Sequence, residues 1–87
     1  MEWIDRLAEA LGLEGPDPEQ TARLLSAARE VAHRVERKTT PLATYVLGMS
    51  VTMRVAEGAT PAAAFDDALS ALLGMLPDAP AVEGADR

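Results

Sequence analysis

Apolar side chains recur at intervals of three and four residues along most of the chain, and this spacing predicts helices. Four helices are predicted, over residues 2–12, 18–38, 41–57 and 61–76. No run alternates apolar and polar residues with the period of two that a half-buried strand requires. Because the predicted connections are short, we expect an all-α fold, a compact antiparallel bundle of four helices.

Capping and breaking residues mark the ends of these helices. Asp17, Thr40 and Thr60 each precede a proline, a pairing typical of an N-cap followed by the first helical residue. Gly12 and Gly58 follow the first and third predicted helices, where a glycine commonly ends a helix. The third helix is therefore predicted to begin directly after Thr40, with the Thr40 hydroxyl as its cap.

The third predicted helix is apolar on two opposite faces, which indicates a helix covered from both sides. The two sets are Leu42, Val46, Met49 and Met53 on one face and Leu47, Val51 and Val55 on the other. The second set is a candidate oligomer interface, which would make a homodimer across a two-fold axis. Gly48 costs this helix about 1 kcal/mol relative to alanine and predicts close approach of another backbone.

Composition bounds the class of protein. The 87 residues suffice for one domain, over residues 1–77, while residues 78–87 lack apolar periodicity and are predicted to form a disordered tail. The absence of cysteine and of a secretion signal favours the cytoplasm. No run approaches the roughly 20 apolar residues that span a bilayer, so we expect no membrane association.

Charge is unevenly distributed along the chain. The 14 acidic and 8 basic residues give a net charge of −6, which argues against nucleic-acid binding by bulk electrostatics. Residues 23–38 nevertheless carry five basic and two acidic side chains, a local charge of +3 that leaves −9 for the remainder. The second predicted helix is thus a basic island on an acidic protein.

The only histidine, His33, lies on the polar face of this basic helix. Arg29, Arg37 and Glu30 lie near it at helical spacing, and a solvated histidine among ion pairs is the favoured interpretation, with a binding role as the alternative. Glu30 and His33 also match one half of a helix-bundle di-metal site, but the second half is missing and the arginines disfavour a cation. We expect no metal and no cofactor.

The end of the second predicted helix and the start of the third also form a candidate anion site. Arginine forks, threonine hydroxyls and free amides at a helix start can hold phosphate or carboxylate. Ordinary capping and the preference of cations for a helix C-terminus explain the same residues almost as well. The candidate interaction or anion-binding residues are His33, Arg34, Glu36, Arg37, Lys38, Thr40 and Thr44.

The sequence offers no catalytic constellation, because it has no cysteine, no serine at workable spacing from the histidine and no glycine-rich elbow. We therefore expect no enzymatic activity.

Two runs, WIDRLAEALGL at residues 3–13 and REVAHRVERKTTPLATYVLG at residues 29–48, resemble a small actinobacterial helical domain family that has no established activity. The resemblance extends over residues 2 to about 75. Members of that family are standalone chains or are fused behind molybdenum-cofactor guanylyltransferase-like nucleotidyltransferases. The resemblance implies an accessory or regulatory interaction module in the biosynthesis of molybdopterin guanine dinucleotide, with a nucleotidyltransferase as partner. The alternatives are a domain that binds a phosphate-bearing or pterin-like anion and a homo-oligomeric structural domain.

Overall fold

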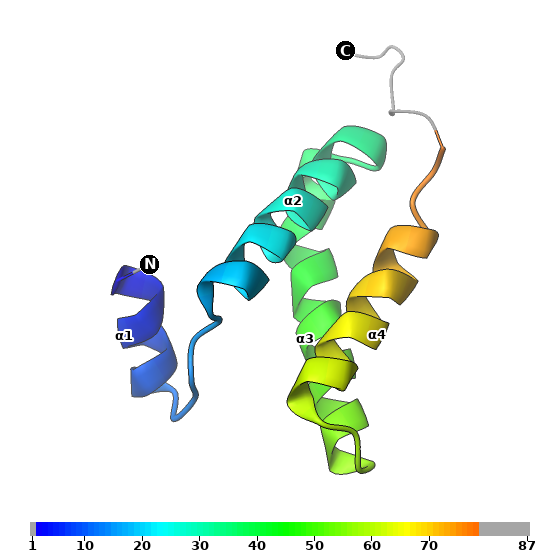
Figure 1. The fold of residues 1–87 in the computed structure, drawn as a ribbon. Coiled ribbons are helices and arrows are strands. Elements are labelled where there is room, and N and C mark those ends of the chain that lie inside the picture. Colours follow the sequence, from blue (N-terminus) through cyan, green and yellow to red (C-terminus); the bar gives the residue numbers. More distant parts are fainter. Residues whose placement is uncertain (1, 79–87) are drawn as a thin grey trace.

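The computed structural model describes residues 2–78, and within that range it contains helices and no strand. The elements are α1 (Glu2–Ala10), α2 (Pro18–Arg34), the 3-10 helix η1 (Arg37–Thr39), α3 (Thr40–Ala56) and α4 (Pro61–Gly74), shown in Figure 1. The predicted all-α class and the four helices are confirmed. The predicted tail lies outside the described residues from residue 79 onward.

The predicted caps of α2 and α4 are confirmed. The Asp17 carboxylate accepts a hydrogen bond from the Gln20 amide at 2.7 Å, and the Gln20 side chain accepts one from the Asp17 amide at 3.0 Å. The Thr60 hydroxyl accepts from the Ala63 amide at 3.1 Å at the start of α4. After α3, Gly58 has a φ of +111°, a conformation that L side chains rarely adopt. Local capping chemistry therefore fixes these boundaries.

The junction between α2 and α3 differs from the prediction. α2 ends at Arg34, four residues before the predicted Lys38, and η1 leads directly into α3 because the Thr40 amide donates to the Arg37 carbonyl. Thr40 is helical, at φ −55° and ψ −51°, and its hydroxyl is buried without a partner. Thr40 is therefore not the N-cap of α3. A residue before proline usually avoids helical backbone, but Thr40 adopts it because η1 and α3 form one continuous helix.

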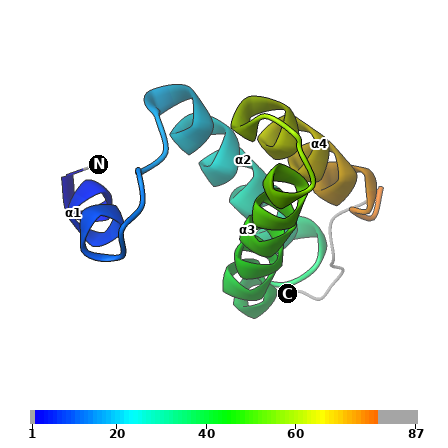
Figure 2. The same cartoon turned by 90° about the horizontal axis from the view of Figure 1, so that it is seen from below.

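Three of the four helices form the core. α3 runs antiparallel to α2 and to α4, and the largest contact is between α3 and α4 (Figure 1). α1 lies beside the start of α2, away from α3 and α4 in both views (Figures 1 and 2), and none of its residues is buried.

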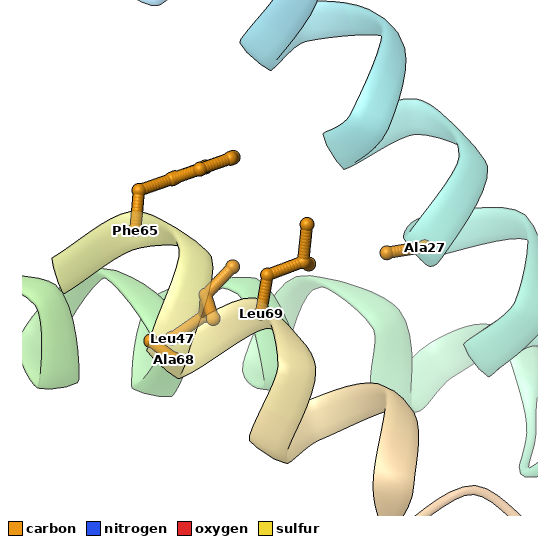
Figure 3. Close-up of a cluster of buried hydrophobic side chains, with 5 residues drawn as sticks. All are labelled: Ala27, Leu47, Phe65, Ala68 and Leu69. Atoms are coloured by element: carbon orange, nitrogen blue, oxygen red, sulfur yellow. The ribbon is translucent and has the colours of Figure 1, made fainter. Parts of the chain in front are cut away.

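The core is small and lies where α2, α3 and α4 meet. Figure 3 shows Phe65 and Leu69 directed from α4 toward α2. Leu24, Val51 and Leu72 pack against this cluster. The buried cluster consists of Ala27, Leu47, Phe65, Ala68 and Leu69.

Arg23 of α2 contacts two residues of α4 at the edge of the core. Its guanidinium lies 5.1 Å from the centre of the Phe65 ring, and its Nη1 is 2.6 Å from the Asp66 carboxylate. Both charged side chains are partly exposed, so this pair contributes at most about 1 kcal/mol. The hydrophobic pattern alone gave no sign of this contact, because it joins residues 43 positions apart.

Candidate functional site

The seven candidate polar residues lie in one stretch of the chain, from the last turn of α2 to the first turns of α3. His33, Arg37 and Lys38 are exposed there, as predicted for the polar face. Lys38 Nζ is 3.9 Å from a Glu36 carboxylate oxygen, a loose and solvated pair. We call this stretch, defined by His33, Arg34, Glu36, Arg37 and Lys38, the basic corner.

Arg34 has a structural role within the basic corner. Its Nε is 2.8 Å from a Glu30 carboxylate oxygen, one turn earlier on α2, and its Nη1 donates to the Pro77 carbonyl at 3.0 Å. The side chain thus ties the end of α2 to the segment after α4. The guanidinium is therefore engaged within the chain and is not directed at a ligand.

Two of the threonines of this region, Thr39 and Thr44, are also engaged within the chain. Thr44 Oγ1 donates to the Pro41 carbonyl at 2.9 Å and lies 3.2 Å from the Thr40 carbonyl. Thr39 Oγ1 donates to the Glu36 carboxylate at 3.3 Å. The Thr40 amide already donates to the Arg37 carbonyl of η1, and Pro41 has no amide hydrogen to donate. The Thr39 and Thr44 hydroxyls and the Thr40 amide are therefore already bonded within the chain, whereas the Thr40 hydroxyl is buried without a partner.

Within residues 2–78, no three histidine, cysteine, aspartate or glutamate side chains are grouped closely enough to hold a metal ion. No described helix has the length and apolar content needed to cross a membrane.

The face of α3 that was predicted to form an oligomer interface packs against the core of its own chain instead. Leu47 is only 6% exposed and belongs to the core, Val51 packs against that core, and Val55 lies at its edge with 37% exposure. The candidate oligomer interface formed by these three residues is therefore wrong, because the chain uses Leu47 and Val51 in its own interior. The pattern predicted two apolar faces but could not say which one the rest of the chain covers.

The opposite face of α3 is solvent-exposed and apolar. Five large side chains at helical spacing on this face are between 51% and 69% exposed. No charged residue occurs between Thr40 and Met53, so the run lacks the charged side that a solvated helix normally has. We call this surface the outer face of α3; it comprises Leu42, Tyr45, Val46, Met49 and Met53.

Gly48 does not mark a close approach within the chain. A Cβ atom built at this position meets no atom within 4 Å, apart from its own helix backbone and its immediate neighbours. The predicted tight packing at Gly48 is therefore wrong for the single chain, and the residue lies exposed on α3.

A groove runs beside the outer face, between the end of α2, the first half of α3 and the second half of α4. Its volume is about 520 Å³ and its lining is almost entirely apolar. Leu42 and Val46 belong to both surfaces, whereas Tyr45, Met49 and Met53 lie outside the groove. Residues lining the groove include Val31, Val35, Leu42, Val46, Ala71 and Met75.

The chain belongs to the family described as Domain of unknown function (DUF6457), whose sequence model matches residues 1–83. Neither the curated proteins nor the solved structures contain a match to this chain. The match covers all four helices and both apolar surfaces described above.

Proposed function

We propose that this chain is an accessory protein-interaction module without catalysis of its own, and that the outer face of α3 is its docking surface. The exposure of five large apolar side chains on one uncharged helix face carries this proposal. Together they present on the order of 500 Å² of surface, the size at which an exposed apolar patch marks an interaction site on a soluble protein.

The basic corner supplies a charged rim at one end of this face. Leu42 follows Lys38 by one helical turn, so the exposed cations of Arg37 and Lys38 lie near the start of the apolar surface. Interfaces commonly combine an apolar centre with a polar rim, and rim charges mainly raise the association rate. In this account, His33, Arg37 and Lys38 orient a partner and the outer face holds it.

The partner that we propose is a molybdenum-cofactor guanylyltransferase-like nucleotidyltransferase. The resemblance of residues 2–75 to domains fused behind such enzymes supports this choice, because a domain fused to an enzyme is held at its surface. The nucleotide chemistry would then belong to the partner, and this chain would be its accessory or regulatory subunit.

Titration of the fluorescently labelled chain with the purified guanylyltransferase of the same organism tests both parts of the proposal. Wild type should bind, and Met49→Glu should weaken binding at least about tenfold, because it places a carboxylate in an apolar contact. Leu25→Glu, a matched change at an exposed leucine of α2, should bind like wild type. A His33→Ala/Arg37→Ala double variant should associate more slowly, with a weaker salt dependence.

Absence of wild-type binding at every enzyme concentration would exclude this partner. Equal affinities for wild type and Met49→Glu would exclude the outer face of α3 as the contact.

A further inference from the structure

Two apolar surfaces of this chain match each other but do not touch within one copy. One is the exposed face of α1, formed by Trp3 and Leu7 and continued by Leu11 in the turn that follows the helix. The other is the groove between α2, α3 and α4. We propose that two copies exchange their first helices, so that α1 of each copy lies in the groove of the other. This dimer shares Leu42 and Val46 with the outer face of α3 but does not use Met49 and Met53, which lie outside the groove.

α1 needs a packing surface to be a stable helix. It has nine residues, and isolated helices shorter than about 12–15 residues are marginal in water. None of its residues is buried in its own chain, while Trp3 is 62% and Leu11 is 65% exposed. An amphipathic helix of this kind commonly binds by laying its apolar face in a hydrophobic groove.

The dimensions of the two surfaces agree. Trp3 and Leu11 are eight residues apart, about 12 Å along a helix. Along α3, the groove extends from Leu42 to Ser50. These residues are also eight positions apart, about 12 Å along the helix. The apolar length of α1 therefore fits the apolar length of the groove wall.

The connection between α1 and α2 keeps α1 away from the groove of its own chain. The Leu13 amide donates to the Ala8 carbonyl at 2.8 Å, and Gly15 lies against Asp5 and Ala8, so the connection folds back on α1. Only Pro16 and the capping residue Asp17 remain as a link, and two residues span at most about 7 Å.

The groove lies at the opposite end of α2. Val31, the nearest groove residue on α2, is 13 residues beyond Pro18, about 20 Å along the helix. α1 therefore cannot reach the groove of its own chain. A second copy can supply α1 instead.

The charges of the two surfaces are complementary. α1 carries three acidic residues and one basic residue, whereas the groove ends beside the exposed cations of the basic corner. Within residues 2–78, Arg37 forms no ion pair, so it is available to a carboxylate such as that of Glu9 in a second copy. This pairing would set the orientation of α1 in the groove.

The area is adequate for a stable dimer. The exposed parts of Trp3, Leu7 and Leu11 amount to on the order of 300 Å². In a reciprocal exchange each copy covers both its α1 face and its groove, roughly 450 Å² of apolar surface in all. A standard interface buries about 800 Å² per partner, of which little more than half is apolar.

Sedimentation equilibrium of the full chain over a roughly hundredfold concentration range tests the exchange. Wild type should show a reversible monomer–dimer equilibrium. Leu7→Glu on α1 and Ala71→Glu on the groove wall should each weaken dimerisation at least about a hundredfold, because each buries a carboxylate in apolar surroundings. Neither side chain belongs to the core, so the helical circular dichroism should not change. Leu25→Glu, outside both surfaces, should dimerise like wild type.

Mixing the two weakened variants distinguishes exchange from any other dimer. The Leu7→Glu copy retains an intact groove and the Ala71→Glu copy retains an intact α1, so the mixture should form a heterodimer through one native contact. A monomeric wild type at every concentration would overturn the proposal, as would a mixture that recovers no dimer. Binding to the guanylyltransferase is tested separately by Met49→Glu, because Met49 lies outside the groove.

Discussion

Leucine-to-alanine changes on the two faces of α3 test which face is the interior. Leu47 is 6% exposed and Leu42 is 65% exposed, five residues apart on the same helix, so an identical change probes opposite environments. The Leu47→Ala variant should lose about 3 kcal/mol of unfolding free energy, because three buried carbon atoms are removed and a cavity remains beside Phe65 and Leu69. Leu42→Ala should change it by less than about 0.5 kcal/mol in the monomer.

These magnitudes are large on the scale of the whole protein. A chain of 87 residues has a total stability of roughly 4–13 kcal/mol. A loss of 3 kcal/mol should therefore lower the Tm of Leu47→Ala by about 12–24 °C, since each kcal/mol shifts a domain of this size by about 4–8 °C. Leu42→Ala should melt within a few degrees of wild type.

Thermal and urea unfolding, followed by circular dichroism at two protein concentrations, measures both variants. The effect of Leu47→Ala should be independent of concentration, whereas any effect of Leu42→Ala through the dimer should shrink on dilution. Equal losses for the two variants at the lower concentration would refute the assignment of Leu47 to the interior and Leu42 to the surface.

Three further changes test local features by urea unfolding. Asp17→Ala should lower the stability by about 1 kcal/mol, because it removes the capping box of α2; an unchanged midpoint would contradict that role. Thr40→Val should leave the stability equal or higher, since the buried hydroxyl has no partner, and a loss above about 1 kcal/mol would mean that this hydroxyl is bonded. Gly48→Ala should raise the stability by up to about 1 kcal/mol, because a Cβ there meets no other atom, and a clear loss would indicate a close contact.

The helices were predictable where the signal is local. The side chain of Asp17 bonds three residues ahead, as does that of Thr60, so the capping chemistry is contained within one turn of sequence. Gly58 ends α3 by a conformation that its own residue type favours. The α2–α3 junction was not predictable in this way, because η1 makes Thr40 helical against the usual effect of a following proline.

The surfaces were less predictable than the helices, since exposure depends on contacts that are distant in sequence. Periodicity predicted two apolar faces for α3. The packing of α2 and α4 against α3 covers Leu47 and leaves Met49 exposed. His33 is exposed, as its place on the polar face of the second helix predicted. The role of Arg34 was missed, because its contact with the Pro77 carbonyl joins residues 43 positions apart. The apolar periodicity of Leu42, Val46, Met49 and Met53 and the absence of charge from Thr40 to Met53 are the sequence signals of the outer face.

The methionine methyl groups report on both proposed contacts in one measurement. Met49 and Met53 lie on the outer face of α3, while Met75 lines the groove. In a sample with methyl-labelled methionine, dilution of the chain alone should shift Met75 and leave the other two unchanged.

Addition of the guanylyltransferase to that sample tests the central claim, that the outer face of α3 is a docking surface. The methyl signals of Met49 and Met53 should shift or broaden as the enzyme is added. Signals of Met49 and Met53 that stay unchanged at saturating enzyme would contradict it.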